Sequence, residues 1–164
     1  MKKRLLTALA LAIALQWALP SYMIYHRYDV LRSGEIFYFS VNPVDPYDAF
    51  RGRYVHLYSP QEVSGYGKYG LITVGADGFA RVTAITDEKP ASGPYVKSDG
   101  GSWFSLPINR YYMDEHLATK AEAYVQQSAA DRETYVAVRV KNGDLVISGL
   151  YVDGVPIEEI TAGL

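Results

Sequence analysis

An uncharged apolar run near the N-terminus limits most strongly how this chain can fold. The run covers the 21 residues 5–25 and follows the basic residues Lys2, Lys3 and Arg4. As a helix it would be about 31 Å long, which is enough to cross the hydrocarbon core of a bilayer. Apolar residues occupy every side of this helix, whereas a helix that packs on a soluble domain is apolar on one face. The sequence therefore predicts a transmembrane anchor over residues 1–28, in contact with membrane lipid.

The residues around the run predict its orientation and its processing. By the positive-inside rule the basic start stays in the cytoplasm, so that the C-terminal domain is extracytoplasmic, in a periplasm-like compartment. A cleaved signal peptide would also have a charged start and an apolar stretch, here residues 5–19. Cleavage favours small residues after the stretch, and the residues found there, QWALPSYMIY, are bulky. We therefore favour an uncleaved, single-pass anchor.

Residues 29–164 have the length of one extracytoplasmic domain. Apolar residues make up 49% of the chain, which predicts a folded core. Without residues 2–4 the chain has 13 basic and 18 acidic residues, whereas a nucleic-acid-binding protein more often has a basic surface. Cys is absent, which excludes disulfides, thiolate metal ligands and a Cys nucleophile. We expect no nucleic-acid partner and no cofactor.

Alternation of apolar and polar residues predicts that most of this domain is β-strand. Asp-Gly at 77–78 and Asn-Gly at 142–143 each separate two such segments, and both dipeptides supply the positive φ angles of a tight hairpin turn. Asp-Gly at 153–154 then turns the chain into a short edge strand. The predicted strand segments are residues 35–41, 53–59, 71–76, 79–86, 134–140 and 144–152.

One helix and one long loop complete the expected fold. The helix is indicated by apolar residues at helical spacing, namely Leu117, Ala121, Tyr124 and Val125. It would begin at Asp114 or at a capping box over residues 119–122. Residues 87–102 are rich in Gly, Pro and Ser and predict a loop. The predicted fold class is mainly β, of the α+β type, with an N-terminal transmembrane helix followed by a small antiparallel β domain with one packed helix.

The stretch 43–60, PVDPYDAFRGRYVHLYSP, combines turn-forming and charged residues. Asp45 can cap a short helical turn that begins at Pro46, and Gly52 can end this turn in a left-handed conformation. The charged residues are Asp45, Asp48, Arg51 and Arg53. They predict either a capped turn held by Asp–Arg pairs or a polar binding site on a connecting segment. We favour the capped turn, because capping explains both carboxylates.

At these residues the chain resembles the GDYXXLXY family, which is named for a Gly-Asp-Tyr-x-x-Leu-x-Tyr signature. The signature is matched at Gly52, Tyr54 and Leu57. Arg53 and Ser59 stand where the signature has Asp and Tyr. These departures argue against a charge-dependent role for Arg53.

Two further stretches extend the resemblance over most of the chain. The family lead-in Asp-Pro-x-Asp-x-x-Arg-Gly is matched at residues 45–52, and RYYMDEHLATKAE, residues 110–122, is similar to the family's Tyr-rich segment before a helix. The resemblance implies a domain with an N-terminal membrane segment and no established activity. In such families the gene often lies beside genes for larger multi-spanning membrane proteins, which implies an integral membrane protein as partner.

A row of polar aromatic side chains is predicted on the strand of the signature. Tyr54, His56 and Tyr58 would share one face, which suits sugars or peptidoglycan, although we favour a second packed face against the helix. No metal site is expected, because His56 and His116 lack the spacing of zinc ligands. The candidate binding residues are Asp45, Asp48, Arg51, Gly52, Arg53, Tyr54, His56, Leu57 and Tyr58.

A Ser–Lys hydrolase similar to signal peptidases is the most specific enzymatic alternative. Ser33 and Ser40 lie near the apolar run, but neither has the Ser-Met context of those enzymes. Lys68 and Lys97 lie in Gly-rich sequence, where a desolvated amine is not expected. No catalytic residue is therefore assigned.

The predicted function is that of a membrane-anchored accessory or binding protein, associated with a larger integral membrane protein. Such a role needs an aromatic or apolar patch with a polar rim, and the 15 Tyr residues supply suitable side chains. The alternative is an envelope-acting enzyme or a glycan- or peptide-binding domain, for example a signal-peptidase-like hydrolase.

Overall fold

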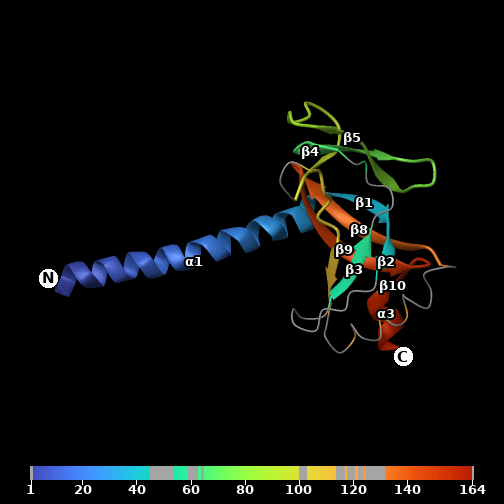
Figure 1. The fold of residues 1–164 in the computed structure, drawn as a ribbon. Helices are drawn as coiled ribbons and strands as arrows, with labels where there is room; N and C mark the ends of the chain where they lie inside the picture. Colours follow the sequence, from blue (N-terminus) through green and yellow to red (C-terminus); the bar gives the residue numbers. More distant parts are fainter. Residues whose placement is uncertain are drawn as a thin grey trace.

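The computed structural model describes residues 2–44, 54–58, 63, 65–99, 103–113, 117, 121, 124 and 132–163. Helix α1 (Lys2–Ser33) extends as a rod from a domain whose described strands form three antiparallel sheets (Figure 1). The C-terminal helix α3 (Ile157–Ala162) lies on the lower side of this domain in the same view. The predicted α+β class, with an N-terminal helix and antiparallel sheets, is confirmed.

The described strands pair in three sheets of three or four strands. The largest has the order β1-β8-β9-β10, with β1 at Glu35–Ser40, β8 at Thr134–Lys141, β9 at Asp144–Val152 and β10 at Val155–Pro156. The second has the order β2-β3-β7, with β2 at Asn42–Val44, β3 at Tyr54–Tyr58 and β7 at Arg110–Tyr112. The third has the order β5-β4-β6, with β4 at Tyr69–Val74, β5 at Ala80–Thr86 and β6 at Tyr95–Lys97.

The β8–β9 hairpin has the two-residue turn that the sequence predicts. Asn142 has a φ of 53° and Gly143 a φ of 83°, so both central residues are left-handed, as a type I′ turn requires. Asp153 and Gly154 repeat this geometry, with φ angles of 50° and 83°, and connect β9 to β10. The Asn-Gly and Asp-Gly dipeptides therefore determine the register of three neighbouring strands.

The β4–β5 hairpin is confirmed, but its turn differs from the prediction. Within the described chain Asp77 does not have a positive φ, whereas Gly78 has a φ of 83°. The Gly78 N–H donates to the Gly75 carbonyl at 3.0 Å, and the Gly75 N–H donates to the Phe79 carbonyl at 2.8 Å. This pattern is a longer loop that contains a four-residue turn, residues 75–78, whose last residue is the left-handed glycine. This loop therefore needs a positive φ only at Gly78 and not at Asp77.

The core forms where the largest sheet faces the third sheet. β1, β8 and β9 contribute alternate side chains, and β4 and β5 contribute Ile72, Ala80 and Val82. The fully buried large side chains are Phe39, Phe104, Leu106, Ile108, Leu150, Ile157, Val30, Val41, Val96, Val136 and Val138. Val30 belongs to α1, so the last turns of this helix are part of the packed domain.

One predicted segment needs correction, one helix was not predicted, and one predicted helix is only partly described. The predicted loop 87–102 contains β6, whose Val96 is completely buried and pairs with β4. Helix α3 was not predicted; it follows the short edge strand. Leu117, Ala121 and Tyr124 are helical, in agreement with the prediction, while the other residues named for that helix, Asp114, Val125 and 119–122 apart from Ala121, lie outside the described residues.

The predicted membrane crossing is not supported. Among the described residues, no helix combines the length and the apolarity needed to cross a membrane. Helix α1 runs without interruption from Lys2 to Ser33 and passes through Pro20, so residue 28, the predicted end of the anchor, lies within this helix.

We expect Gly143→Ala to destabilise the domain more than Gly154→Ala. Both glycines have a φ of 83°, which costs an alanine about 1–2 kcal/mol. A Cβ at Gly143 would lie 2.5 Å from the Tyr95 ring, whereas a Cβ at Gly154 would meet no atom within 4 Å. The overlap should add about 1–3 kcal/mol to the cost at Gly143. Urea unfolding followed by circular dichroism measures both losses, and equal losses would disprove the close packing of Tyr95 on the turn.

Candidate functional site

The predicted binding residues fall into two groups in the structure. Asp45, Asp48, Arg51, Gly52 and Arg53 lie outside the described residues, as does His116. Tyr54, His56, Leu57 and Tyr58 lie on β3, which confirms the predicted strand. The backbone of β3 pairs with β2 on one side and with β7 on the other, so that Tyr54 is opposite Tyr112.

The sheet that contains β3 is joined to helix α3 by Tyr111 of β7. The Tyr111 hydroxyl donates a hydrogen bond to the Glu158 carboxylate of α3. Burial, and then this hydrogen bond to an anion, raise the pKa of Tyr111 above its ordinary value. Tyr111 therefore remains a neutral hydrogen-bond donor over the physiological pH range.

Charged side chains gather where the end of α1 meets the β8–β9 hairpin. On one side of the turn, Asp144 accepts hydrogen bonds from His26 Nε2 at 3.1 Å and from Lys97 Nζ at 3.0 Å. On the other side, Lys141 Nζ donates to Asp29 at 2.7 Å and to the Ser33 hydroxyl at 2.8 Å. We call this set, His26, Asp29, Ser33, Lys97, Lys141 and Asp144, the helix clamp.

Backbone groups strengthen the same junction. Arg27 donates to the Leu145 carbonyl at 2.9 Å, and Arg139 donates to the Gly34 carbonyl at 3.1 Å. Each partly exposed ion pair contributes little by itself, about 0–1 kcal/mol, whereas several around one buried apolar residue hold a fixed orientation. Val30, next to Asp29 in α1, is completely buried, so this end of the helix is held by burial of an apolar side chain as well as by the helix clamp.

The pKa values of both clamp carboxyls are lowered. For Asp144, burial alone would raise the pKa, but the hydrogen bonds and charges of Lys97 and His26 outweigh burial and bring it below its ordinary value. For Asp29, the hydrogen bond from Lys141 is the largest cause of the lowered pKa. Both carboxylates are therefore fully ionised at neutral pH.

The helix clamp contains a Ser–Lys pair, which tests the predicted hydrolase alternative. Ser33 is one of the two serines considered as nucleophiles, and the Lys141 amine lies 2.8 Å from its hydroxyl. A catalytic lysine must accept a proton, yet Lys141 donates to both oxygens of Asp29, at 2.9 and 2.7 Å. The Ser33 hydroxyl is itself directed to the Asp29 carbonyl at 2.8 Å. This arrangement fits a structural ion pair at a helix end better than an activated nucleophile.

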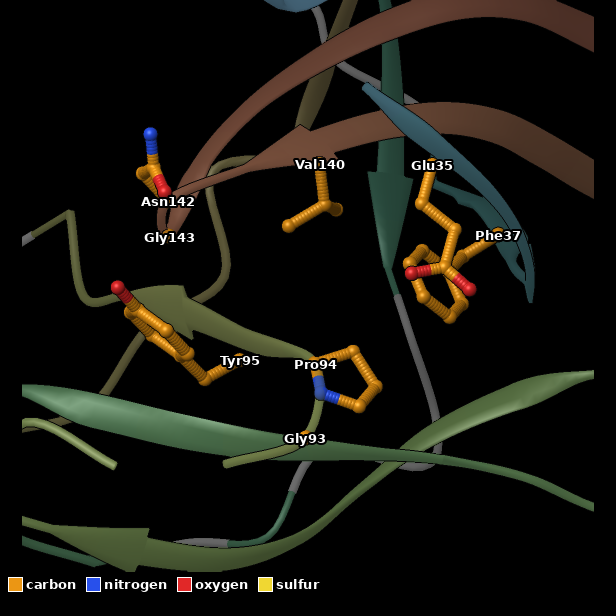
Figure 2. Close-up of a pocket in the computed structure, with 8 residues that line it drawn as sticks. All are labelled: Glu35, Phe37, Gly93, Pro94, Tyr95, Val140, Asn142 and Gly143. Atoms are coloured by element: carbon orange, nitrogen blue, oxygen red, sulfur yellow. The ribbon is translucent and has the colours of Figure 1, made fainter. Parts of the chain in front are cut away.

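A cavity of about 350 Å³ lies beside the helix clamp (Figure 2). Glu35 and Phe37 of β1 and Val140 of β8 form one side, and the segment from Gly93 to Tyr95 forms the facing side. The turn residues Asn142 and Gly143 close one end. This site could not be predicted from the sequence, because its walls come from a strand start, a hairpin turn and a segment with the composition of a loop.

The cavity has a buried apolar base and a polar rim. Phe37 and Val140 are only 4% and 7% exposed, whereas Glu35 and Asn142 are exposed. Within the described part of the chain, neither the Glu35 carboxylate nor the Asn142 amide forms a hydrogen bond or an ion pair. Both groups are therefore available to a ligand that has hydroxyl or amine groups on one side and an apolar face on the other. An apolar base with a polar rim suits the binding of such a ligand.

The helix clamp predicts a loss of stability in acid. A carboxyl whose pKa is lower in the folded than in the unfolded protein stabilises the fold above the unfolded pKa, and this contribution disappears as the pH falls through the folded value. The urea midpoint should therefore fall as the pH is lowered from about 5 to about 3. D29N/D144N should unfold earlier at pH 7 and show a smaller acid-dependent loss. D87N, which changes an exposed carboxyl outside the clamp, is the control, and an acid dependence of D29N/D144N equal to that of D87N would contradict the prediction.

Comparison with known proteins identifies the chain's relatives at the family level. The GDYXXLXY protein family model matches residues 16–150, which includes the second half of α1 and every strand from β1 to β8, as well as most of β9. Curated proteins and solved structures give no match. The matched part contains all six residues of the helix clamp and the whole cavity lining, so these features lie within the region that defines the relatives. The match covers well over half of the sequence, and the chain therefore belongs to the GDYXXLXY protein family.

Proposed function

We propose that this protein is a membrane-associated accessory protein that binds a larger integral membrane protein through helix α1. Figure 1 shows that the N-terminal part of α1 leaves the domain. The observation that carries the proposal is a row of exposed apolar side chains along this part of the helix. Between 47% and 70% of each is exposed. Apolar surface of this extent is typical of sites that contact a membrane or another protein. The row consists of Leu6, Leu9, Leu11, Ile13, Leu15, Trp17, Leu19, Tyr22, Met23, Ile24, Tyr25 and Tyr28.

The order of residues along α1 supports insertion into a membrane. Basic residues occupy its N-terminal end, and aromatic residues gather between Trp17 and Tyr28, where amphipathic rings suit the boundary between lipid and water. The proposed orientation has the N-terminus in the cytoplasm and the β domain outside. The helix clamp would then lie just outside the membrane surface.

A groove at the base of α1 supports a protein partner in addition to lipid. Met23, Ile24, Tyr28 and Leu31 of α1, the stem of Arg27 and Val146 of β9 bound about 460 Å³ of almost entirely apolar space. A side chain from a partner helix that fills this groove would touch α1 and β9 together. A partner bound in this groove would therefore contact the β domain as well as α1, whereas lipid around α1 alone would not.

A ligand-binding role for the β domain is the second candidate, and the cavity in Figure 2 favours it. Its Glu35 and Asn142 side chains, which form no hydrogen bond or ion pair with any described residue, suit a small polar ligand, as the envelope-binding alternative requires. The two roles are compatible, because the cavity and the exposed part of α1 do not share residues.

Membrane association can be tested with the full-length chain in isolated membranes. The protein should remain in the pellet after an alkaline carbonate wash. Substitution of Leu9, Leu11 and Leu15 by Asp should release it, because each acidic residue opposes insertion by on the order of 3 kcal/mol. The matched control places Asp at Tyr66, Val74 and Val155, which are exposed apolar residues of the β domain, and should stay in the pellet. Release of the wild-type protein by carbonate would overturn the proposal.

Partner binding can be tested by photo-crosslinking in native membranes. A photoreactive amino acid at Met23, in the groove, should give an adduct with an integral membrane protein, because the groove is the proposed contact. The same probe at Tyr66, which is 72% exposed on the β domain, serves as the control. Adducts with lipid alone from position 23 would exclude the protein partner.

A further inference from the structure

Aromatic rings from three distant parts of the chain meet around Tyr135 at the start of β8. The Tyr38 ring of β1 meets the Tyr135 ring edge-on, with 5.6 Å between centroids and 90° between planes. The Phe79 ring, from the turn between β4 and β5, lies 5.6 Å from the Tyr135 ring at 60°. A hollow of about 260 Å³ opens between them. We call it the aromatic hollow, and its lining residues are Tyr38, Asp77, Gly78, Phe79, Glu133 and Tyr135.

The central ring of the aromatic hollow is held in place from behind. Tyr151, directly opposite Tyr135 in the β8–β9 register, stacks on it with 5.3 Å between centroids and 6° between planes. Gly149 leaves room for the Tyr151 ring, because a Cβ there would lie 2.8 Å from it. Burial raises the pKa of Tyr135, so its ring keeps a neutral phenol at pH 7. The hollow is therefore organised before any ligand enters.

The charge on the aromatic hollow is negative. Asp77 accepts hydrogen bonds from Arg81 with both oxygens, so its charge is largely offset. Glu133 is fixed through its backbone N–H, which donates to the Asp153 carboxylate at 3.0 Å. The Glu133 carboxylate itself forms no hydrogen bond or ion pair with any described residue, and the lining contains no basic side chain. One uncompensated carboxylate therefore lies beside exposed ring surface.

This combination selects one class of ligand. Aromatic faces attract cations through their quadrupole, and an adjacent carboxylate adds direct charge attraction. A neutral ligand would use the rings alone and leave the Glu133 carboxylate without a partner, whereas an anion would be repelled. The volume suits a compact group, such as a trimethylammonium group or the end of a lysine side chain.

We propose that the aromatic hollow bounded by Tyr38, Phe79 and Tyr135, with Glu133 on its rim, binds an alkylammonium group. Tyr38 and Phe79 provide the open ring surface, and Glu133 provides the counter-charge. The hollow lies at the Ser40 end of β1, away from the helix clamp at the Glu35 end. Its ligand is therefore separate from the partner proposed for α1.

The probe is choline, titrated to about 100 mM against the full-length protein in maltoside micelles, with aromatic NMR signals as the readout. Choline should cause saturable shifts in the signals of Tyr38, Phe79 and Tyr135. 3,3-Dimethylbutan-1-ol, the uncharged analogue of the same shape, should bind at least about 3-fold more weakly. A lysine-containing tripeptide that acts like choline would show that the site accepts a protein side chain as well as a free amine; a response to choline alone would restrict it to small quaternary amines.

Variants separate the contributions of ring and charge. Tyr38→Ala and Glu133→Gln should each weaken choline binding by about 3- to 10-fold, and both residues are exposed, so the fold should survive. Tyr38→Phe keeps the ring and should bind as the wild type does. Tyr66→Ala removes another exposed ring, which pairs with Trp103 elsewhere, and should change nothing. The proposal is overturned if choline and its uncharged analogue bind equally, or if Glu133→Gln leaves choline binding unchanged.

Discussion

The two-residue turn at Asn142 and Gly143 is the constraint on which the arrangement of the domain depends. It puts Lys141 directly opposite Asp144 in the register, so one cation and one anion stand side by side at the end of the β8–β9 hairpin. Each of them then engages a side chain of α1, Lys141 pairing with Asp29 and Asp144 with His26. The Gly143 carbonyl accepts a hydrogen bond from the Lys97 N–H at 2.8 Å, which joins the third sheet to the same turn. A one-residue slip of this register would send both ions to the other face, and helix and third sheet would lose their attachment together.

The sequence indicated the hairpins because their turns depend on local conformation. Asn-Gly and Asp-Gly dipeptides favour left-handed backbone, and the segments beside them alternate clearly enough to define strands. β6 was missed because three residues among Gly, Pro and Ser carry too short a pattern, and its burial comes from contacts with β4 and with the β8–β9 turn, which lie far away in the sequence. The buried series Phe104, Leu106 and Ile108 also alternates with period two, and this signal was present in the sequence but was not used.

The candidate sites, unlike the hairpins, depend on contacts between residues that are far apart in the sequence. A binding site was considered in the stretch 43–60 because its charged and turn-forming residues are adjacent in the chain. The cavity of Figure 2 and the aromatic hollow instead combine residues more than 50 positions apart, such as Glu35 with Tyr95 and Tyr38 with Tyr135. The surplus of Tyr predicted aromatic surface in general, and the sheet register alone decides which rings meet. Ser33 and Lys141 likewise become neighbours only because α1 docks on β8, and Asp29 then gives the pair a structural role.

The connection between α1 and β1 decides how the two ends of the molecule influence each other. A single residue, Gly34, separates Ser33 from Glu35, and its N–H donates to the Val30 carbonyl at 2.8 Å. A Cβ at Gly34 would lie 2.5 Å from that carbonyl, so the chain turns there with no spare length. With the helix clamp closing the other side, α1 has no linker that could absorb a change in its direction. Any partner that fixes the exposed part of α1 therefore also fixes the orientation of the β8–β9 hairpin, and with it the direction in which the cavity and the aromatic hollow open.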